Sequence, residues 1–305
     1  MNARNVVPPT ELVTTRPTQV RSGVFSHAVA WLRSDVLGLV GFVILAIVVL
    51  VAIFAPWIAP FPNDAHGATH PEQVLLPPSA EHWFGTDQVG RDVLSRVIFG
   101  AQTSLIIVVC VLSIAIVIGV SLGLIAGYVG GVTEVVIMRI TDIFLAFPAL
   151  LLSVALTAVL TPSLHVMIIA IAVTWWPWYA RLTVGLAKSI RARGFIDAAR
   201  CLGQPPLRIL WRHMLPNTTT PVTIQASLDA GGVILTAAAL SFLGLGAREP
   251  VSEWGLMIQQ GQTLFMTNWW VIGAPGLAIL ATGFAFNMLG EGLRTGFAPS
   301  MKVVK

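Results

Sequence analysis

Long stretches without a charged side chain restrict the fold of this chain more than any other feature. No Asp, Glu, Lys or Arg occurs between Asp35 and Asp64, or between Arg96 and Glu134. A helix of about 20 apolar residues crosses the hydrocarbon core of a bilayer, where only helices and closed barrels satisfy their backbone polar groups. Charged residues make up 10% of the sequence, against about a quarter in soluble domains. These features predict an all-α polytopic membrane protein.

The apolar stretches predict six transmembrane helices. The stretch that follows Asp142 is too long for one helix, and the turn residues of "TPSLH" (161–165) divide it. The expected spans are 36–58, 101–127, 136–160, 165–187, 218–246 and 270–291. Residues 1–35 are then a polar cytosolic tail, and residues 36–305 form one transmembrane domain, with an extracytoplasmic loop at about 59–99 and a cytosolic loop at about 188–217.

The distribution of basic residues predicts the orientation of these helices. Six spans place both termini and the loop at 188–217 on one side of the membrane. All 18 lysines and arginines except Arg91, Arg96 and Arg248 lie on or next to that side. Because Lys and Arg are concentrated in cytoplasmic loops, we expect both termini and the loop at 188–217 to be cytosolic.

Motifs for enzymatic chemistry are absent from the sequence. The phosphate-binding pattern G-x-x-x-x-G-K-[ST] does not occur, since none of the three lysines follows a glycine. The patterns H-E-x-x-H and G-x-S-x-G are missing as well. Histidines and glutamates occur between His66 and His82, but a polar segment rich in proline is typical of a solvated loop rather than a metal site. We therefore expect no catalytic group, no metal and no cofactor bound by this chain.

Small residues repeat on one face of the second expected helix. Gly119, Gly123, Gly127 and Gly131 follow one another at intervals of four residues. Such a row lets another helix approach closely inside the membrane. Packing within the chain is one interpretation, and a contact with a second membrane subunit is the other.

Asp229 is an isolated acid in the fifth expected helix. An acid at the centre of a span costs roughly 3 kcal/mol on insertion scales, so it should face protein or water. It lies either on a solute path or against a partner subunit, or it is a structural acid that a neighbouring helix satisfies. A second acid, Asp142, is expected to pair with Arg139 one helical turn away.

A basic insert, "DAARCLGQPPLRILWRHMLPN" (197–217), interrupts the apolar sequence before the fifth expected helix. Gly203 is placed to end a first short helix, and Pro205 and Pro206 suit the first turn of a second one. Pro216 is expected to stop that second helix. Two short helices joined at a glycine would project from the membrane and offer a docking element to a cytosolic partner.

The insert resembles the EAA loop of permease subunits of binding-protein-dependent ABC importers. The matching residues are Asp197, Ala198, Ala199, Gly203, Leu215 and Pro216. Asp197 stands where the family usually has glutamate, which keeps the charge and shortens its reach. Four more segments resemble the second permease of dipeptide, oligopeptide and nickel importers: "HWFGTDQVGRDVLSRVIFGAQTSL" (82–105), "DIFLAFPALLL" (142–152), "LSFLGLG" (240–246) and "FNMLGEGLR" (286–294). The resemblance covers the chain from about residue 30 to its end.

This resemblance implies the transmembrane domain of a type I ABC importer in a prokaryotic inner membrane. The chain would form half of a pathway for di- or oligopeptides with a second, homologous permease. Two cytosolic ATPases would hold ATP and Mg²⁺ and dock on the insert, and an extracytoplasmic substrate-binding protein would deliver the solute. Nickel or another solute is an alternative cargo. An ion-coupled secondary carrier is a further alternative, although Asp229 is the chief ionisable residue deep in a span. No nucleic acid is expected as a partner.

Overall fold

The computed structural model describes residues 36–297, and within this part of the chain the regular elements are helices. The expected tail at 1–35 lies outside the described residues. The helices are α2 (Val36–Ile53), α3 (Ala55–Ile58), α4 (Val93–Val129), α5 (Gly131–Leu145), α6 (Ala149–Val159), α7 (Leu164–Arg191), α8 (Gly194–Cys201), α9 (Pro206–Ile209), α10 (Leu215–Phe242), α11 (Trp254–Gly261) and α12 (Trp270–Phe297). Three short 3₁₀ helices occupy Pro62–His66, Pro71–Gln73 and Gln262–Leu264, and a π-helical turn occupies Leu210–Met214.

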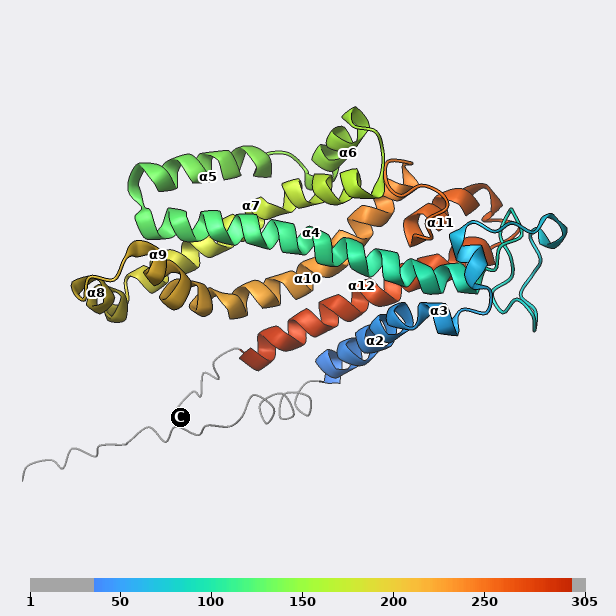
Figure 1. The fold of residues 1–305 in the computed structure, drawn as a ribbon, viewed down its shortest axis with the longest axis horizontal. Coiled ribbons are helices and arrows are strands. Elements are labelled where there is room, and N and C mark those ends of the chain that lie inside the picture. The colour runs from blue at the N-terminus through green and yellow to red at the C-terminus, as the bar shows by residue number, and fades with distance from the viewer. Residues whose placement is uncertain (1–35, 298–305) are drawn as a thin grey trace, which may run out of the picture.

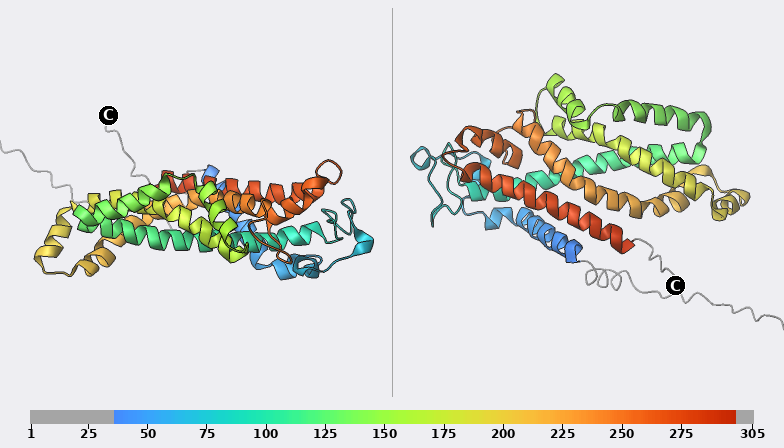
Figure 2. Two further views of the ribbon diagram at one scale, coloured as in Figure 1. Left: turned by 90° about the horizontal axis from the view of Figure 1, so that it is seen from above. Right: turned by 180° about the vertical axis from the view of Figure 1, so that it is seen from behind.

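The long helices lie side by side in an elongated bundle (Figures 1 and 2). One end of the bundle carries α8 and α9, and the other carries α11 and the connection between α3 and α4. We refer to these as the α8 end and the α11 end. The described ends of α2 and α12 at Val36 and Phe297 point toward the α8 end (Figure 1). This arrangement places the start and the end of the described chain on one side of the bundle.

Length and hydropathy identify most of the expected membrane spans. Helix α2, helix α4, the helical segment Pro206–Phe242 and helix α12 are each long and apolar enough to cross a membrane, and the bent pair α5–α6 counts as one more candidate. Helix α7, which covers the expected fourth span, falls short of this hydropathy and carries Trp175, Trp176, Trp178 and Arg181. The all-α membrane fold is thus confirmed.

The expected third span is wrong as a single helix. Helices α5 and α6 meet at an angle of 84° around Ala146–Pro148. Pro148 is the cause, because its ring disfavours helical geometry at Phe147 and it offers no N–H to continue the helical hydrogen bonds. Asp142 also departs from expectation, since it pairs with Arg181 of α7 rather than with Arg139.

Helix α4 begins earlier than the expected start at 101. Its N-cap is Asp92, whose carboxylate accepts a hydrogen bond of 2.7 Å from the N–H of Ser95. The basic side chain of Arg96 therefore lies inside the helix, where Asp87 neutralises it at 2.6 Å. The loop expected at about 59–99 ends at 92 for the same reason.

The glycine row of α4 packs against α7 of the same chain. A Cβ atom on Gly119, Gly123 or Gly127 would lie 2.4 to 2.7 Å from the nearest atom of α7, and for Gly119 that atom is a backbone oxygen. Gly131 does not belong to this row, because the chain turns at Gly130 and Gly131 begins α5 with a φ of +57°. Three of the four glycines thus set the distance between α4 and α7.

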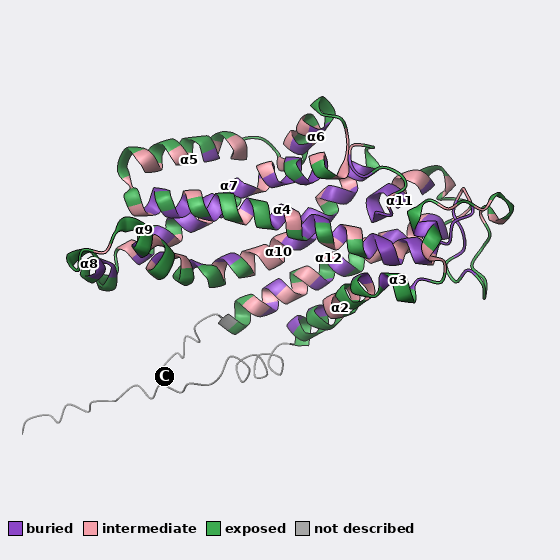
Figure 3. Cartoon of the chain, viewed as in Figure 1, coloured by how far each residue is buried: buried purple, intermediate pink, exposed green. Residues whose placement is uncertain are grey.

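The buried core lies where α4, α7 and α10 meet (Figure 3). Helix α2 is exposed over most of its surface and is buried chiefly at Gly38, Gly41 and Ala52. Gly41 provides its closest approach to α12, since a Cβ atom there would lie 2.7 Å from the carbonyl oxygen of Ala285. The bundle is therefore built on three tightly packed helices, with α2 attached at the edge.

Candidate functional site

The insert forms a short helix that projects beyond the bundle (Figure 1). Asp197, Ala198 and Ala199 lie on α8, which Gly203 ends with a φ of +73°. The N–H of Gly203 donates to the carbonyl of Arg200 and the N–H of Gln204 to that of Ala199, at 2.9 and 3.1 Å. This pattern is a Schellman motif, which requires a left-handed residue and favours glycine. The predicted helix end at Gly203 is confirmed.

The outer surface of the insert is unusually apolar for a segment outside the bundle. Asp197 is 65% exposed, and Ala198 and Gly203 are exposed with it, whereas Ala199 is buried. Leu202 and Leu207 are 79% and 70% exposed. Exposed apolar groups gathered on one segment are typical of an interaction surface. Ala199 therefore makes a buried contact, and Ala198 belongs to this exposed surface.

The second half of the insert differs from the prediction, because Pro216 does not stop a helix. The N–H of Leu215 donates to the carbonyl of Leu210, which closes a π-helical turn, and α10 continues through Pro216. The wider turn accommodates a proline that has no N–H to donate. Leu215 and Pro216 thus form the first residues of α10, at the junction of insert and bundle.

Arg200 of the insert and Lys188 at the end of α7 contact α4 and α5 where these two helices meet. The guanidinium of Arg200 lies 5.1 Å from the ring centroid of Tyr128 at the end of α4, within the range of a cation–π contact. Lys188 forms an ion pair of 2.5 Å with Glu134 of α5. Arg200 also lies 3.4 Å from Asp197. The sequence motif does not indicate a role for Tyr128, because Tyr128 lies 72 positions before its partner Arg200 in the chain.

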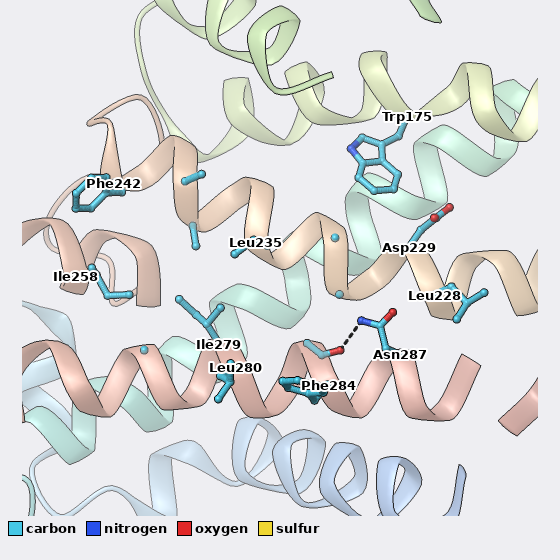
Figure 4. Close-up of a pocket in the computed structure, with 16 residues that line it drawn as sticks. Trp175, Leu228, Asp229, Leu235, Phe242, Ile258, Ile279, Leu280, Phe284 and Asn287 are labelled. Carbon is cyan, nitrogen blue, oxygen red and sulfur yellow. Dashed lines mark hydrogen bonds between the residues drawn. The ribbon is translucent and has the colours of Figure 1, made fainter. Parts of the chain in front are cut away.

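A cavity of about 720 Å³ lies between α7, α10, α11 and α12 (Figure 4). Asp229 of α10 lies at one end of it, near Trp175 of α7. The Oδ1 atom of Asp229 accepts a hydrogen bond of 2.9 Å from Gln225, whereas its Oδ2 atom is buried and has no hydrogen-bond partner among the described residues, although the phenol of Tyr179 lies near the carboxyl group. Among the described residues, no cation forms an ion pair with Asp229. Neighbouring side chains thus hold this acid, and it also borders an open space.

A buried ionic network joins two segments at the α11 end. Arg91 and Arg96 both bind Asp87, at 2.7 and 2.6 Å, and each of the three side chains is at most 3% exposed. Arg91 also binds Glu249, at 2.9 Å, in the connection between α10 and α11. Gln260 of α11 binds both Arg96 and Glu249. The network fixes the connection between α3 and α4 to α11.

Two histidines of this end, His70 and His82, have carboxylate partners. His82 Nδ1 lies 3.0 Å from Asp92 Oδ1, and both side chains are buried. His70 Nε2 lies 3.0 Å from Asp64 Oδ1. Asp64 in turn accepts a hydrogen bond from the backbone of Asp92. In the described part of the chain no three His, Cys, Asp or Glu side chains are grouped as metal ligands.

Comparisons with known proteins give two family matches. The model described as the binding-protein-dependent transport system inner membrane component matches residues 119–303. The model described as the N-terminal TM domain of oligopeptide transport permease C matches residues 25–78. The two matches cover the insert, the cavity and the first span.

Named relatives match most of the chain. The dipeptide transport system permease protein DppC of Alkalihalophilus pseudofirmus is 42% identical over 271 residues, which cover 89% of this chain and 88% of that protein. The probable D,D-dipeptide transport system permease protein DdpC of Escherichia coli is 43% identical over 263 residues, with 86% and 87% covered. The glutathione transport system permease protein GsiD of Escherichia coli is 44% identical over 261 residues, with 86% and 85% covered. The chain therefore belongs to the family of inner membrane components of binding-protein-dependent transport systems.

Proposed function

We propose that the chain is the permease subunit of an ATP-driven importer of di- or oligopeptides and forms half of its translocation pathway. The insert carries this proposal, because it presents the pattern of Asp197, Ala198 and Gly203 on a short helix that projects from the bundle. Relatives that are 42% and 43% identical to it over 271 and 263 aligned residues are named as dipeptide permeases. Peptides are therefore the favoured cargo.

The insert is the proposed docking element for two cytosolic ATPases. The sequence has no phosphate-binding loop of its own, so ATP and Mg²⁺ belong to these partner subunits. Ala198 and Gly203 present little bulk to a partner, and Asp197 offers it a carboxylate. The excess of Lys and Arg on the side of the insert in the sequence supports a cytosolic position for the insert and for both termini.

The α11 end is the proposed contact for the substrate-binding protein. It lies opposite the insert (Figure 1), and the ionic network around Asp87 makes its two segments one body. The pathway itself requires a second, homologous permease. Asp229 is the candidate pathway residue of this chain, because it borders the cavity between α10 and α12.

Another solute of the same importer family is the second candidate. One relative with 44% identity is named as a glutathione permease, so the family fold accepts more than one cargo. Nickel is an alternative on the ground of the sequence resemblance. A secondary carrier driven by ions would import solute without ATP, and an ATP-depleted control separates it from the importer.

Uptake of a labelled dipeptide by cells with and without this chain tests the function. We expect uptake that requires both the chain and ATP. Gly203→Asp should abolish uptake while the protein still inserts, because it adds bulk and charge at the docking surface. Gly131→Asp is a matched control, since Gly131 also has a positive φ, at the start of α5, and no atom within 4 Å of a Cβ position. Equal uptake by both variants contradicts docking at Gly203, and uptake that persists without the chain contradicts a peptide importer.

A further inference from the structure

The cavity between α10 and α12 is hollow because glycines line it. Gly276 and Gly283 of α12 border the cavity, and a Cβ atom on either would meet nothing within 4 Å. The opposite wall on α10 contains Gly231 and Gly232, which instead allow close packing, since a Cβ atom there would lie 2.8 Å from Asn287 and 2.9 Å from Trp175. Ligand pockets for small molecules have volumes of about 300–1,000 Å³, and this cavity of about 720 Å³ lies within that range. The space is therefore large enough for a small peptide.

The cavity has one charged end, and the rest of its lining is apolar. The acidic end holds Asp229, whose side chain points toward α7 and Trp175, and Asn287 lines the cavity from α12 (Figure 4). The remaining walls carry Leu235, Phe242, Ile279, Leu280 and Phe284. A carboxylate inside a membrane domain is stabilised by a cation, and the described residues give Asp229 one hydrogen bond from the amide of Gln225 and leave its Oδ2 atom without a hydrogen-bond partner. A solute with a cationic group and an apolar group complements this lining.

We propose that this cavity is a solute subsite, which holds the protonated amino group of a peptide at its Asp229 end and an apolar side chain along its walls. This proposal rests on the proposed function and adds a specificity element within the permease itself. The substrate-binding protein then selects a peptide before it enters the permease, and the cavity favours solutes with a free amino terminus during passage. A lipid acyl chain in the same space would have no cation for Asp229. A basic side chain of the second permease would be the other source of a cation.

Equilibrium binding to the assembled transporter tests this subsite. We reconstitute both permeases and the ATPases in lipid nanodiscs without the substrate-binding protein. This complex is titrated with radiolabelled alanyl-leucine and with N-acetyl-alanyl-leucine. We expect Asp229→Asn to raise the Kd for alanyl-leucine at least about tenfold, because a charge-assisted contact is lost. The acetylated peptide should bind the wild-type complex as weakly as alanyl-leucine binds the variant.

Filling the cavity gives an independent test with a matched control. Gly283→Leu places a side chain in the open space of the cavity, and Gly185→Leu adds the same side chain at an exposed position of α7 that also has no neighbour within 4 Å. We expect Gly283→Leu to weaken the binding of alanyl-leucine at least about tenfold and Gly185→Leu to leave it unchanged.

Four results would overturn the subsite. They are wild-type affinity in Asp229→Asn, equal binding of the two peptides, no binding of alanyl-leucine to the wild-type complex, and loss of the second permease from the Asp229→Asn complex. The last result would assign Asp229 to the contact between the permeases. Uptake in cells separates this inference from the function, because dipeptide import with any of these results refutes the subsite alone, whereas absence of dipeptide import refutes the proposed function.

Discussion

Replacing Asp87 with asparagine should destabilise the α11 end more than any other single loss of charge there. The Asp87 carboxylate is 1% exposed and accepts hydrogen bonds from the side chains of Arg91 and Arg96 and from the backbone N–H groups of Val89 and Arg91. Without its charge, Arg91 keeps Glu249 as an ion-pair partner and Arg96 keeps none among the described residues, although both guanidinium groups are at most 3% exposed. Breaking a buried ion pair on one side costs about 3–5 kcal/mol.

The melting temperature of the purified complex measures this effect. At about 2–4 °C per kcal/mol for a domain of this size, Asp87→Asn should lower it on the order of 10 °C. Glu249→Gln is the control, because Glu249 is 55% exposed and a surface ion pair contributes at most about 1 kcal/mol. A variant with Asp87→Leu, Arg91→Met and Arg96→Met should recover most of the loss, since no buried charge is left unpaired. A melting temperature of Asp87→Asn within 2 °C of that of Glu249→Gln, on the order of the error of such a comparison, would refute the reasoning.

Three further changes test the packing, the connection of the insert and the pH dependence. Gly119→Leu should lower the stability of the complex by about 1–3 kcal/mol in a thermal unfolding assay, because its Cβ meets a backbone oxygen of α7 at 2.4 Å, whereas Gly185→Leu should be close to neutral. Tyr128→Leu should lower the amount of solute transported per ATP hydrolysed, since Arg200 loses its aromatic partner, and Tyr128→Phe should keep the wild-type ratio. Burial raises the pKa of the Glu253 carboxyl above its ordinary value of 4.5, so the folded state binds its proton more tightly than the unfolded state, and stability should fall as pH rises from 4.5 through the folded pKa. Glu253→Gln should abolish this contribution, and an unchanged slope of melting temperature against pH in that variant would contradict it.

Most helices could be predicted from the sequence because each long apolar stretch carries its own signal. The errors occur where a single proline or a residue far away in the sequence determines where a helix begins or ends. Pro148 breaks the third span, although the residues on both sides of it are apolar. Arg96 lies inside α4 because Asp87 neutralises its charge, and a hydropathy average does not include this ion pair. The π-helical turn before Pro216 lets α10 start there, although a proline in this position usually ends a helix.

The candidate site divides in the same way. The insert could be predicted because its residues are local and Gly203 has a defined role in ending a helix. The cavity could not be predicted, since residues from four helices form it. Gly276 and Gly283 contribute to it because they have no side chain to fill the space. The bond between Arg91 and Glu249 joins residues 158 positions apart, and no local pattern indicates it.

The two helices that flank the insert also meet at the cavity. Helix α7 enters the insert and carries Trp175 and Tyr179 opposite Asp229, and α10 leaves the insert and carries Asp229 itself. From Leu215 to Asp229 the helix is unbroken, and at 1.5 Å per residue this distance is about 20 Å. Pro221 lies inside this stretch and removes one hydrogen bond of the helix. If a partner docks on α8 as proposed, a displacement of α8 would reach the end of the cavity where Asp229 lies through α7 and α10.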